Sequence, residues 1–104
     1  MSKIYVFDLD GTLCETKGTF YEKSTPIHSR INQVNKLYDD GNIIVVETAR
    51  GSHSGRNWWY FTVDQLNSWG LKFHTLRTGV KFSGDFFIDD KGVNDKDFFN
   101  GINK

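Results

Sequence analysis

The stretch IYVFDLDGTL, residues 4–13, decides how this chain is expected to fold. Four largely apolar residues, 4–7, run directly into Asp8 and Asp10, which are separated by one residue and followed by Gly-Thr. A short apolar run bounded by Asp-Gly is typical of a buried β-strand that ends in a turn. Two carboxylates this close repel each other, so their position at a strand tip indicates a specific chemical role rather than surface solubility.

Apolar runs elsewhere in the chain predict further strands and helices. Helical spacing of apolar residues begins after Thr25-Pro26, which suit an N-cap and first helical position, and ends before Gly41. A second helix is expected from Trp58 to Trp69, and Asn94 could cap a short terminal helix. The expected strands are 3–7, 43–46, 73–76 and 86–88.

This order, β-α-β-α-β-β-α, favours an α/β fold with a parallel sheet covered by helices on both faces. The joint from Arg77 to Asp85 is short for a crossover between parallel strands. Nine extended residues still span roughly 30 Å, so a loop can make the return without a helix. We therefore keep the parallel reading across all four strands.

Composition limits the classes of protein and partner. The 104 residues suit a single domain, and a formal net charge of zero disfavours a nucleic-acid partner and an anionic membrane. The lone Cys14 excludes an internal disulfide and a cysteine-based zinc site. No apolar run approaches the roughly 18 residues of a membrane span, and the N-terminus lacks the apolar core of a signal peptide. A soluble, cytoplasmic protein is expected.

Polar side chains that suit phosphate chemistry follow several of the predicted strands. Functional groups of parallel sheets collect beyond the carboxyl ends of the strands, so these side chains are expected to meet at one edge. They are Asp8 and Asp10 after the first strand, Thr48 and Arg50 after the second, Lys81 before the fourth, and Asp89 and Asp90 after it.

The order FDLDGTL, Thr48, Lys81, Asp89-Asp90 resembles the four ordered motifs of the haloacid dehalogenase superfamily, whose members are mostly phosphatases. The match runs from residue 4 to residue 92, most of the chain. The resemblance implies a Rossmann-like fold, a Mg²⁺ ion and an aspartyl-phosphate intermediate. The family often shows Gly-Lys-Pro where this chain has Val80-Lys81-Phe82, which leaves the conformation of that loop open.

The same resemblance implies a role for each acidic residue of the first motif. Asp8 is the expected nucleophile, because a covalent carboxyl-phosphate splits a very slow hydrolysis into two steps. Asp10 is the expected general acid and base, for which its pKa should be raised by the neighbouring carboxylates. Gly11 permits a sharp turn that lets the backbone approach a phosphate.

A hard cation would offset the repulsion among these carboxylates, and Mg²⁺ prefers oxygen ligands. By resemblance its ligands are Asp8, Asp89 and the backbone carbonyl of Asp10, with Asp90 nearby. Thr48 and Lys81 would supply a hydroxyl and a positive charge to the phosphoryl oxygens.

Several of these residues also have simpler interpretations. Asp8 and Asp10 could form an ordinary Asp-Gly turn, but that does not explain the second acidic pair after another strand. Arg50, His53 and Arg56 are candidates for contacts with the substrate beyond its phosphate, and a polar loop without such contacts is an equal alternative. Cys14 is expected to be a packing residue rather than a nucleophile.

The spacing of the motifs leaves no room for a cap domain over the active site. Residues 14–24 can form only a short flap, so either the substrate is large or a neighbouring subunit of a homo-oligomer covers the open site. The capless subgroup includes sugar-acid phosphatases, so a small phosphorylated metabolite such as a sugar phosphate is the expected substrate.

Two other functional classes stay open at this point. One is a nucleotide or polynucleotide phosphatase, although the neutral charge weighs against a nucleic acid. The other is a non-enzymatic protein, either a phosphoacceptor signalling domain or an inactive phosphate-binding module. A receiver domain carries its acidic pair after the first strand, whereas here the adjacent pair Asp89-Asp90 comes late.

Overall fold

The computed structural model describes residues 2–80 and 93–100 of the chain. The expected strand 86–88 and the candidate site residues Lys81, Asp89 and Asp90 lie outside the described residues. The predicted joint between the third and fourth strands lies there as well.

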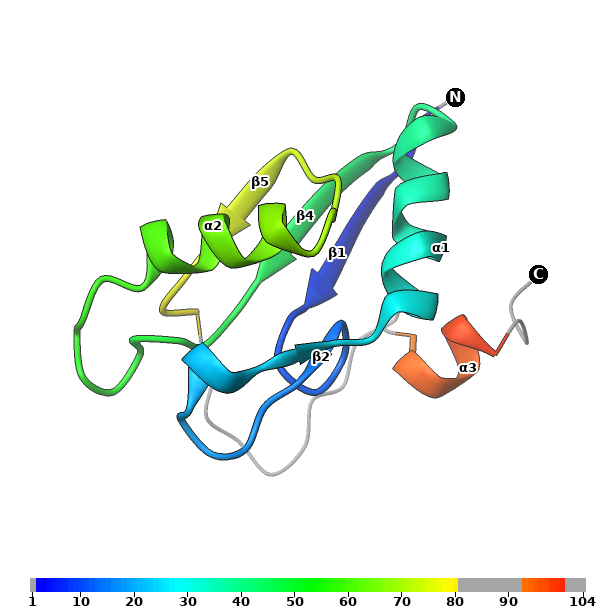
Figure 1. The fold of residues 1–104 in the computed structure, drawn as a ribbon. Helices are drawn as coiled ribbons and strands as arrows, with labels where there is room; N and C mark the ends of the chain where they lie inside the picture. The colour runs from blue at the N-terminus through cyan, green and yellow to red at the C-terminus, as the bar shows by residue number, and fades with distance from the viewer. Residues whose placement is uncertain (1, 81–92, 101–104) are drawn as a thin grey trace.

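Three parallel strands form the central sheet (Figure 1). They are β1 (Ile4–Asp8), β4 (Ile43–Glu47) and β5 (Thr75–Arg77), in the order β1-β4-β5. The pairing of Tyr5 with Ile44 and of Val45 with Thr75 sets the register. The prediction of a parallel α/β sheet is therefore confirmed for these strands.

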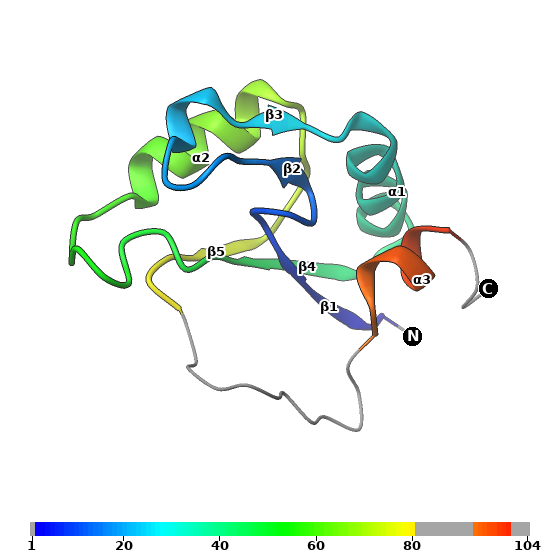
Figure 2. The ribbon, with the colours of Figure 1, turned by 90° about the horizontal axis from the view of Figure 1, so that it is seen from below.

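One face of the sheet carries the hydrophobic core. Alternation along the strands directs Phe7, Ile44 and Leu76 to the same side, where all three are buried. Two helices cover this face, α1 (His28–Asp39) and α2 (Trp59–Ser68), as seen edge-on in Figure 2. They contribute Ile31, Val34 and Leu66 to the core cluster.

The expectation of helices on both faces is wrong for the described residues. On the side opposite the core, Ile4 is 66% exposed and Val6 is 55% exposed. The short helix α3 (Asp95–Phe99) lies beside α1, where the Asp95 carboxylate accepts a hydrogen bond from Arg30 at 2.8 Å. Its Phe99 ring lies 5.9 Å from Phe7, on the core side.

The predicted helix start at Thr25-Pro26 is also wrong. These residues form strand β3 (Thr25–Pro26), which pairs antiparallel with β2 (Cys14–Glu15). Pairing with β2 holds the segment extended, and the helix begins only at His28. Between the two strands lies a single 3-10 turn, η1 (Tyr21–Lys23). The short flap predicted for residues 14–24 extends to Pro26 in the structure, and we call residues 14–26 the flap.

The predicted helix ends are confirmed. Gly41 and Gly70 have positive φ angles of 94° and 75° directly after the two long helices. The Asn94 side chain caps α3 by accepting a hydrogen bond from the Lys96 amide. Tyr60 is 72% exposed, because adjacent aromatic rings on a helix cannot all face inward.

The described segments between strands are short. β1 and β4 are joined by the flap and α1, while β4 and β5 are joined by a loop and α2. No cap domain is therefore present within residues 2–80 and 93–100. None of the helices in this part of the chain is long and apolar enough to span a membrane.

Candidate active site

The described site residues gather at the carboxyl edge of the sheet. Asp8 ends β1, and its register partner Glu47 ends β4, so the residues after both strands emerge side by side. Thr48 directly follows β4, and its hydroxyl donates a hydrogen bond to Asp10 Oδ2 at 3.0 Å. The prediction that these two motifs meet in space is confirmed.

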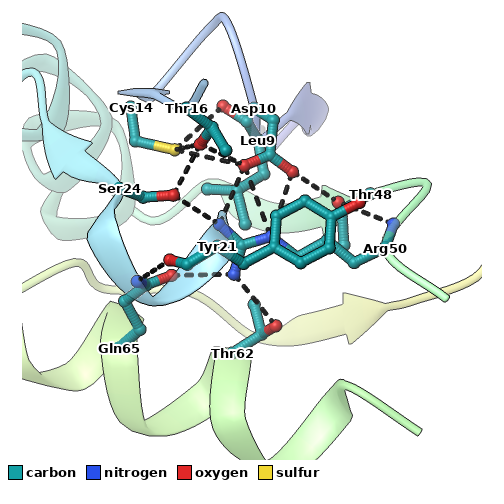
Figure 3. Close-up of polar contacts among 10 residues, drawn as sticks. All are labelled: Leu9, Asp10, Cys14, Thr16, Tyr21, Ser24, Thr48, Arg50, Thr62 and Gln65. Carbon is teal, nitrogen blue, oxygen red and sulfur yellow. Dashed lines mark hydrogen bonds and ion pairs between the residues drawn. The ribbon is translucent and has the colours of Figure 1, made fainter. Parts of the chain in front are cut away.

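Arg50 holds the carboxylate of Asp10 in a two-pronged ion pair (Figure 3). Its Nε lies 3.0 Å from Asp10 Oδ2 and its Nη2 lies 2.8 Å from Asp10 Oδ1. The Arg50 side chain is completely buried, whereas that of Asp10 keeps 25% of its surface exposed. The guanidinium is thus committed to Asp10, which does not support the tentative assignment of Arg50 to the substrate.

The remaining donors of Arg50 are also satisfied. Nη1 donates to Gln65 Oε1 at 2.7 Å and to the Thr62 hydroxyl at 3.2 Å, both on α2. The flap supplies the Ser24 hydroxyl at 3.3 Å and the Tyr21 ring, whose centroid lies 4.6 Å from the guanidinium carbon. A buried charge is tolerated only when it is paired and hydrogen-bonded, and this surrounding meets both conditions.

The pKa of Asp10 is shifted in the direction opposite to the prediction. Burial would raise this pKa, but hydrogen bonds from Arg50, Thr16 and Thr48 outweigh burial and lower it below its ordinary value. We expected neighbouring carboxylates to dominate, because the sequence did not reveal that Arg50 contacts Asp10 directly. In the free protein Asp10 is therefore held as a carboxylate.

Asp8 is the carboxyl group whose pKa is raised. Desolvation by surrounding protein atoms is the largest cause, and the charge of Asp10 adds to it. The Leu9 amide and the Thr12 hydroxyl, the latter 3.5 Å from Asp8 Oδ2, act in the opposite direction. The residue as a whole remains exposed, so its carboxylate can be reached by a ligand from solvent.

Gly11 forms the turn that follows the acidic pair. It has a φ of 86°, and its amide donates to the Cys14 carbonyl at 2.8 Å. The amides of Leu13 and Cys14 both donate to the Leu9 carbonyl, which tightens the turn. The predicted sharp turn at Gly11 is confirmed.

The flap contributes contacts that sequence reasoning missed. The Thr16 hydroxyl donates to Asp10 Oδ1 at 2.7 Å and lies 2.6 Å from the Ser24 hydroxyl. The Gln65 amide group donates to the Tyr21 carbonyl at 2.8 Å. These are ordinary polar residues without a spacing signal, so only the fold brings them together around Asp10 and Arg50.

Cys14 is buried beneath this network. Its thiol donates to the Leu9 carbonyl at 3.7 Å, and desolvation raises its pKa to about 11. Both observations agree with the prediction that Cys14 is a packing residue, because a reactive cysteine needs an accessible thiolate.

The described oxygen donors fit part of a Mg²⁺ site. Asp8 offers an accessible carboxylate, the type of ligand that hard cations prefer. Both carboxylate oxygens of Asp10 already accept hydrogen bonds, which leaves its backbone carbonyl as the ligand predicted from the resemblance. Residues 2–80 and 93–100 hold no group of three acidic, histidine or cysteine side chains arranged for a metal, and Asp89 lies outside these ranges.

A cavity of about 400 Å³ lies between the flap and the loop after β4. Tyr21 and Glu22 line it from the flap, while His53 and Arg56 line it from the loop. The three candidate substrate residues are thus divided: His53 and Arg56 face the cavity, whereas Arg50 lies buried beside Asp10.

Comparison with known proteins finds a structural relative. A target protein from Vibrio cholerae has a crystal structure that matches with a TM-score of 0.80 and 26% sequence identity. The match covers 95% of this chain and 88% of the Vibrio chain. No protein-family model matches the sequence, and no curated protein does either. The likeness supports the α/β fold.

Proposed function

We propose that this chain is a Mg²⁺-dependent phosphomonoester hydrolase that acts through an aspartyl-phosphate on Asp8. In this proposal the sheet is the Rossmann-like core of a capless member of the haloacid dehalogenase superfamily. The observation that carries the proposal is the meeting of an accessible Asp8 with Thr48 and an anchored Asp10 at the carboxyl edge of the sheet. The motifs that resemble the family are those that supply these side chains.

Asp8 suits the role of nucleophile. In the first step a carboxylate oxygen of Asp8 bonds to phosphorus, while the bond from phosphorus to the leaving oxygen breaks and that oxygen takes a proton from Asp10. In the second step water attacks phosphorus and gives a proton to Asp10, the acyl-phosphate bond breaks, and Asp8 is restored with release of phosphate.

The two steps need Asp10 in different protonation states, and the contact with Arg50 favours only one of them. An ionised Asp10 suits the second step, because a base must accept a proton from water. The first step needs a protonated Asp10, which Arg50 opposes. The negative charge of an arriving phosphate would offset Arg50 and raise the pKa of Asp10, so substrate binding itself would favour protonation.

Two acceptors compete for the hydroxyl hydrogen of Thr48, the Asp10 carboxylate and a phosphoryl oxygen of the substrate. Its hydroxyl hydrogen is used by Asp10 in the free protein. The predicted contact between Thr48 and a phosphoryl oxygen therefore requires the hydroxyl to turn away from Asp10, which a protonated Asp10 would permit.

A bound Mg²⁺ would supply positive charge against the phosphate and the clustered carboxylates. Asp8 and the Asp10 carbonyl would hold it, together with Asp89 by resemblance. Lys81 and Asp90 keep the roles predicted for them, as a phosphoryl contact and a neighbour of the metal.

An open site without a cap suits a small phosphorylated metabolite such as a sugar phosphate, covered in a homo-oligomer by a neighbouring subunit. A nucleotide or polynucleotide phosphatase is the second enzymatic alternative. An inactive phosphate-binding module or phosphoacceptor domain would show metal and phosphate binding, or phosphorylation of Asp8, without turnover.

Hydrolysis of p-nitrophenyl phosphate with and without Mg²⁺ tests this proposal. We expect Mg²⁺-dependent release of phosphate, and a loss of roughly a thousandfold or more in kcat in the Asp8→Asn protein. The Lys72→Gln variant serves as a control, because Lys72 forms an exposed ion pair with Asp39, the last residue of α1. Full turnover by Asp8→Asn would refute the mechanism.

With p-nitrophenyl phosphate, whose phenolate leaves without a proton, the Asp10→Asn protein should still phosphorylate Asp8 but lose steady-state turnover, because the second step then lacks its base. Trapping of the acyl-phosphate after mixing with substrate, followed by mass spectrometry, would detect it. Unchanged steady-state kinetics would contradict the role of Asp10.

A further inference from the structure

The cavity between the flap and the loop after β4 directly adjoins the candidate active site. Ala49, which follows Thr48, lines one side of the cavity, and Tyr21 lines the other. The Tyr21 ring also contacts Arg50, the anchor of Asp10. A group bound in the cavity would therefore lie next to the residues proposed to act on the phosphate.

The loop that forms the outer wall has a fixed shape. Gly51 has a φ of 87°, and a Cβ at this position would lie 2.3 Å from the Arg56 carbonyl oxygen. The chain folds back so closely that only glycine fits, and the Gly55 amide closes the turn on the Gly51 carbonyl at 2.9 Å. This turn places Arg56 and Trp58 on the cavity wall.

Aromatic contacts connect this wall to the active site. The Arg56 guanidinium carbon lies 4.3 Å from the centroid of the Trp58 ring. Trp58 meets Tyr21 edge to face at 4.9 Å, and the Tyr21 ring also contacts the Arg50 guanidinium. Arg56 is thus held over a ring that is itself packed against the flap.

Arg56 differs from the other arginines of the chain. Arg30, Arg50 and Arg77 each pair with a carboxylate. Within the described residues Arg56 has no such partner, and its side chain is exposed. Among the described residues that line the cavity, Glu22 is the only acidic one, and no ion pair between described residues joins it to Arg56. The Arg56 guanidinium, positioned over Trp58, is therefore available for an anion from solution.

We propose that this cavity binds the leaving group of the substrate and that Arg56 recognises a second anionic group on it, either a phosphate or a carboxylate. The inference rests on the proposed phosphatase function and narrows its substrate class to phosphomonoesters that carry two anionic groups. The cavity volume of about 400 Å³ falls in the range of small-molecule sites.

Matched substrate pairs test this inference by steady-state kinetics. Fructose 1,6-bisphosphate against fructose 6-phosphate measures the effect of a second phosphate, and 6-phosphogluconate against glucose 6-phosphate measures that of a carboxylate. We expect at least one doubly anionic member to be preferred by roughly tenfold or more in kcat/KM, mainly through KM. The preferred pair identifies which anion is recognised.

The Arg56→Gln variant should lower kcat/KM far more for the doubly anionic member of the preferred pair than for its singly anionic partner or for p-nitrophenyl phosphate, while Arg56→Lys should retain part of the preference. Lys72→Gln, which removes an exposed charge elsewhere, should keep the full preference. Equal loss on every substrate in Arg56→Gln, or no preference in the unmodified protein, would overturn the inference.

A binding measurement separates this inference from the proposed function. Calorimetry with the same four sugar phosphates on the Asp8→Asn protein needs no turnover, and the Arg56→Gln change in that background should again remove the preference. A preference in binding without phosphatase activity would refute the function but keep the subsite. Activity on p-nitrophenyl phosphate without any preference among the sugar phosphates would support the function and refute the subsite.

Discussion

Replacing Arg50 by methionine should destabilise the protein more than any other single change to an ion pair described above. Methionine keeps an unbranched apolar chain but removes the guanidinium, so Asp10, Gln65 and Thr62 lose their shared partner. Breaking a buried ion pair by removing one member costs about 3–5 kcal/mol. Water can still reach Asp10, whose side chain is 25% exposed, so we expect a cost near the lower end, about 3 kcal/mol.

Urea unfolding followed by tryptophan fluorescence measures this cost. With an m-value of about 1–2 kcal/mol/M for a small domain, the midpoint should fall by roughly 1.5–3 M at an unchanged m-value. The loss is a large share of the roughly 5–15 kcal/mol that stabilises a typical domain. Circular dichroism before denaturation would establish that the variant is folded.

The Lys72→Met variant is the matched control. It also replaces a cation by methionine, but the side chains of Lys72 and Asp39 are 49% and 57% exposed. Exposed pairs contribute about 0–1 kcal/mol, so its midpoint should change little. If Arg50→Met costs less than about 1 kcal/mol, the buried pair does not anchor the site in the way its geometry indicates.

The remaining predictions concern three other positions. The hydrogen bond from Arg30 lowers the pKa of Asp95 from its ordinary value, so this pair stabilises the fold at neutral pH and its contribution is lost as the pH falls through the lowered pKa; the destabilisation by Asp95→Asn should therefore be measurable at pH 7 and shrink progressively as the solution is acidified. Iodoacetamide should modify native Cys14 far more slowly than the unfolded chain at pH 8, since burial raises its pKa to about 11; equal rates followed by mass spectrometry would contradict the burial. Gly51→Ala should destabilise the protein by about 1–3 kcal/mol, because its Cβ would meet the Arg56 carbonyl and the φ is strained; a thermal melt identical to that of the unmodified protein would show that the turn can relax.

The parts of the fold that follow from local signals were predictable. The apolar runs of β1 and β4 are strands because their β-branched and aromatic residues favour extended backbone, and the structure pairs them in parallel. Gly41 and Gly70 mark helix ends because each takes a positive φ. Asn94 caps α3 for the same local reason, a short side chain that reaches the helix amides.

Tertiary contacts decided the features that the sequence did not predict. Thr25-Pro26 has the residue types of a helix start, but pairing with Cys14–Glu15 makes it a strand. Exposed Ile4 and Val6 belong to a run that looks fully buried in sequence. The local pattern allows a helix start or a strand in the first case and buried or exposed side chains in the second. Contacts with other parts of the chain select between these alternatives.

The candidate site divides in the same way. The meeting of Asp8, Asp10 and Thr48 was predictable, since carboxyl ends of parallel strands share one edge. The direction in which the Asp10 pKa shifts was not predictable. It depends on the contact between Asp10 and Arg50, which lie 40 residues apart in the sequence. A basic residue close to a strand end could equally face a substrate, solvent or a carboxylate.

The network around Arg50 also bears on the order in which the protein folds. It joins Asp10, the flap, the end of β4 and α2, and the bond between Gln65 and the Tyr21 carbonyl spans 44 residues of sequence. Closing such long loops costs chain entropy before any contact is gained, so structures rich in distant pairings form slowly. Because Arg50 and Gln65 hold the flap against the rest of the protein, the site would be completed only after β1 has paired with β4. The recovery of the proposed phosphatase activity during refolding would then report when the flap docks.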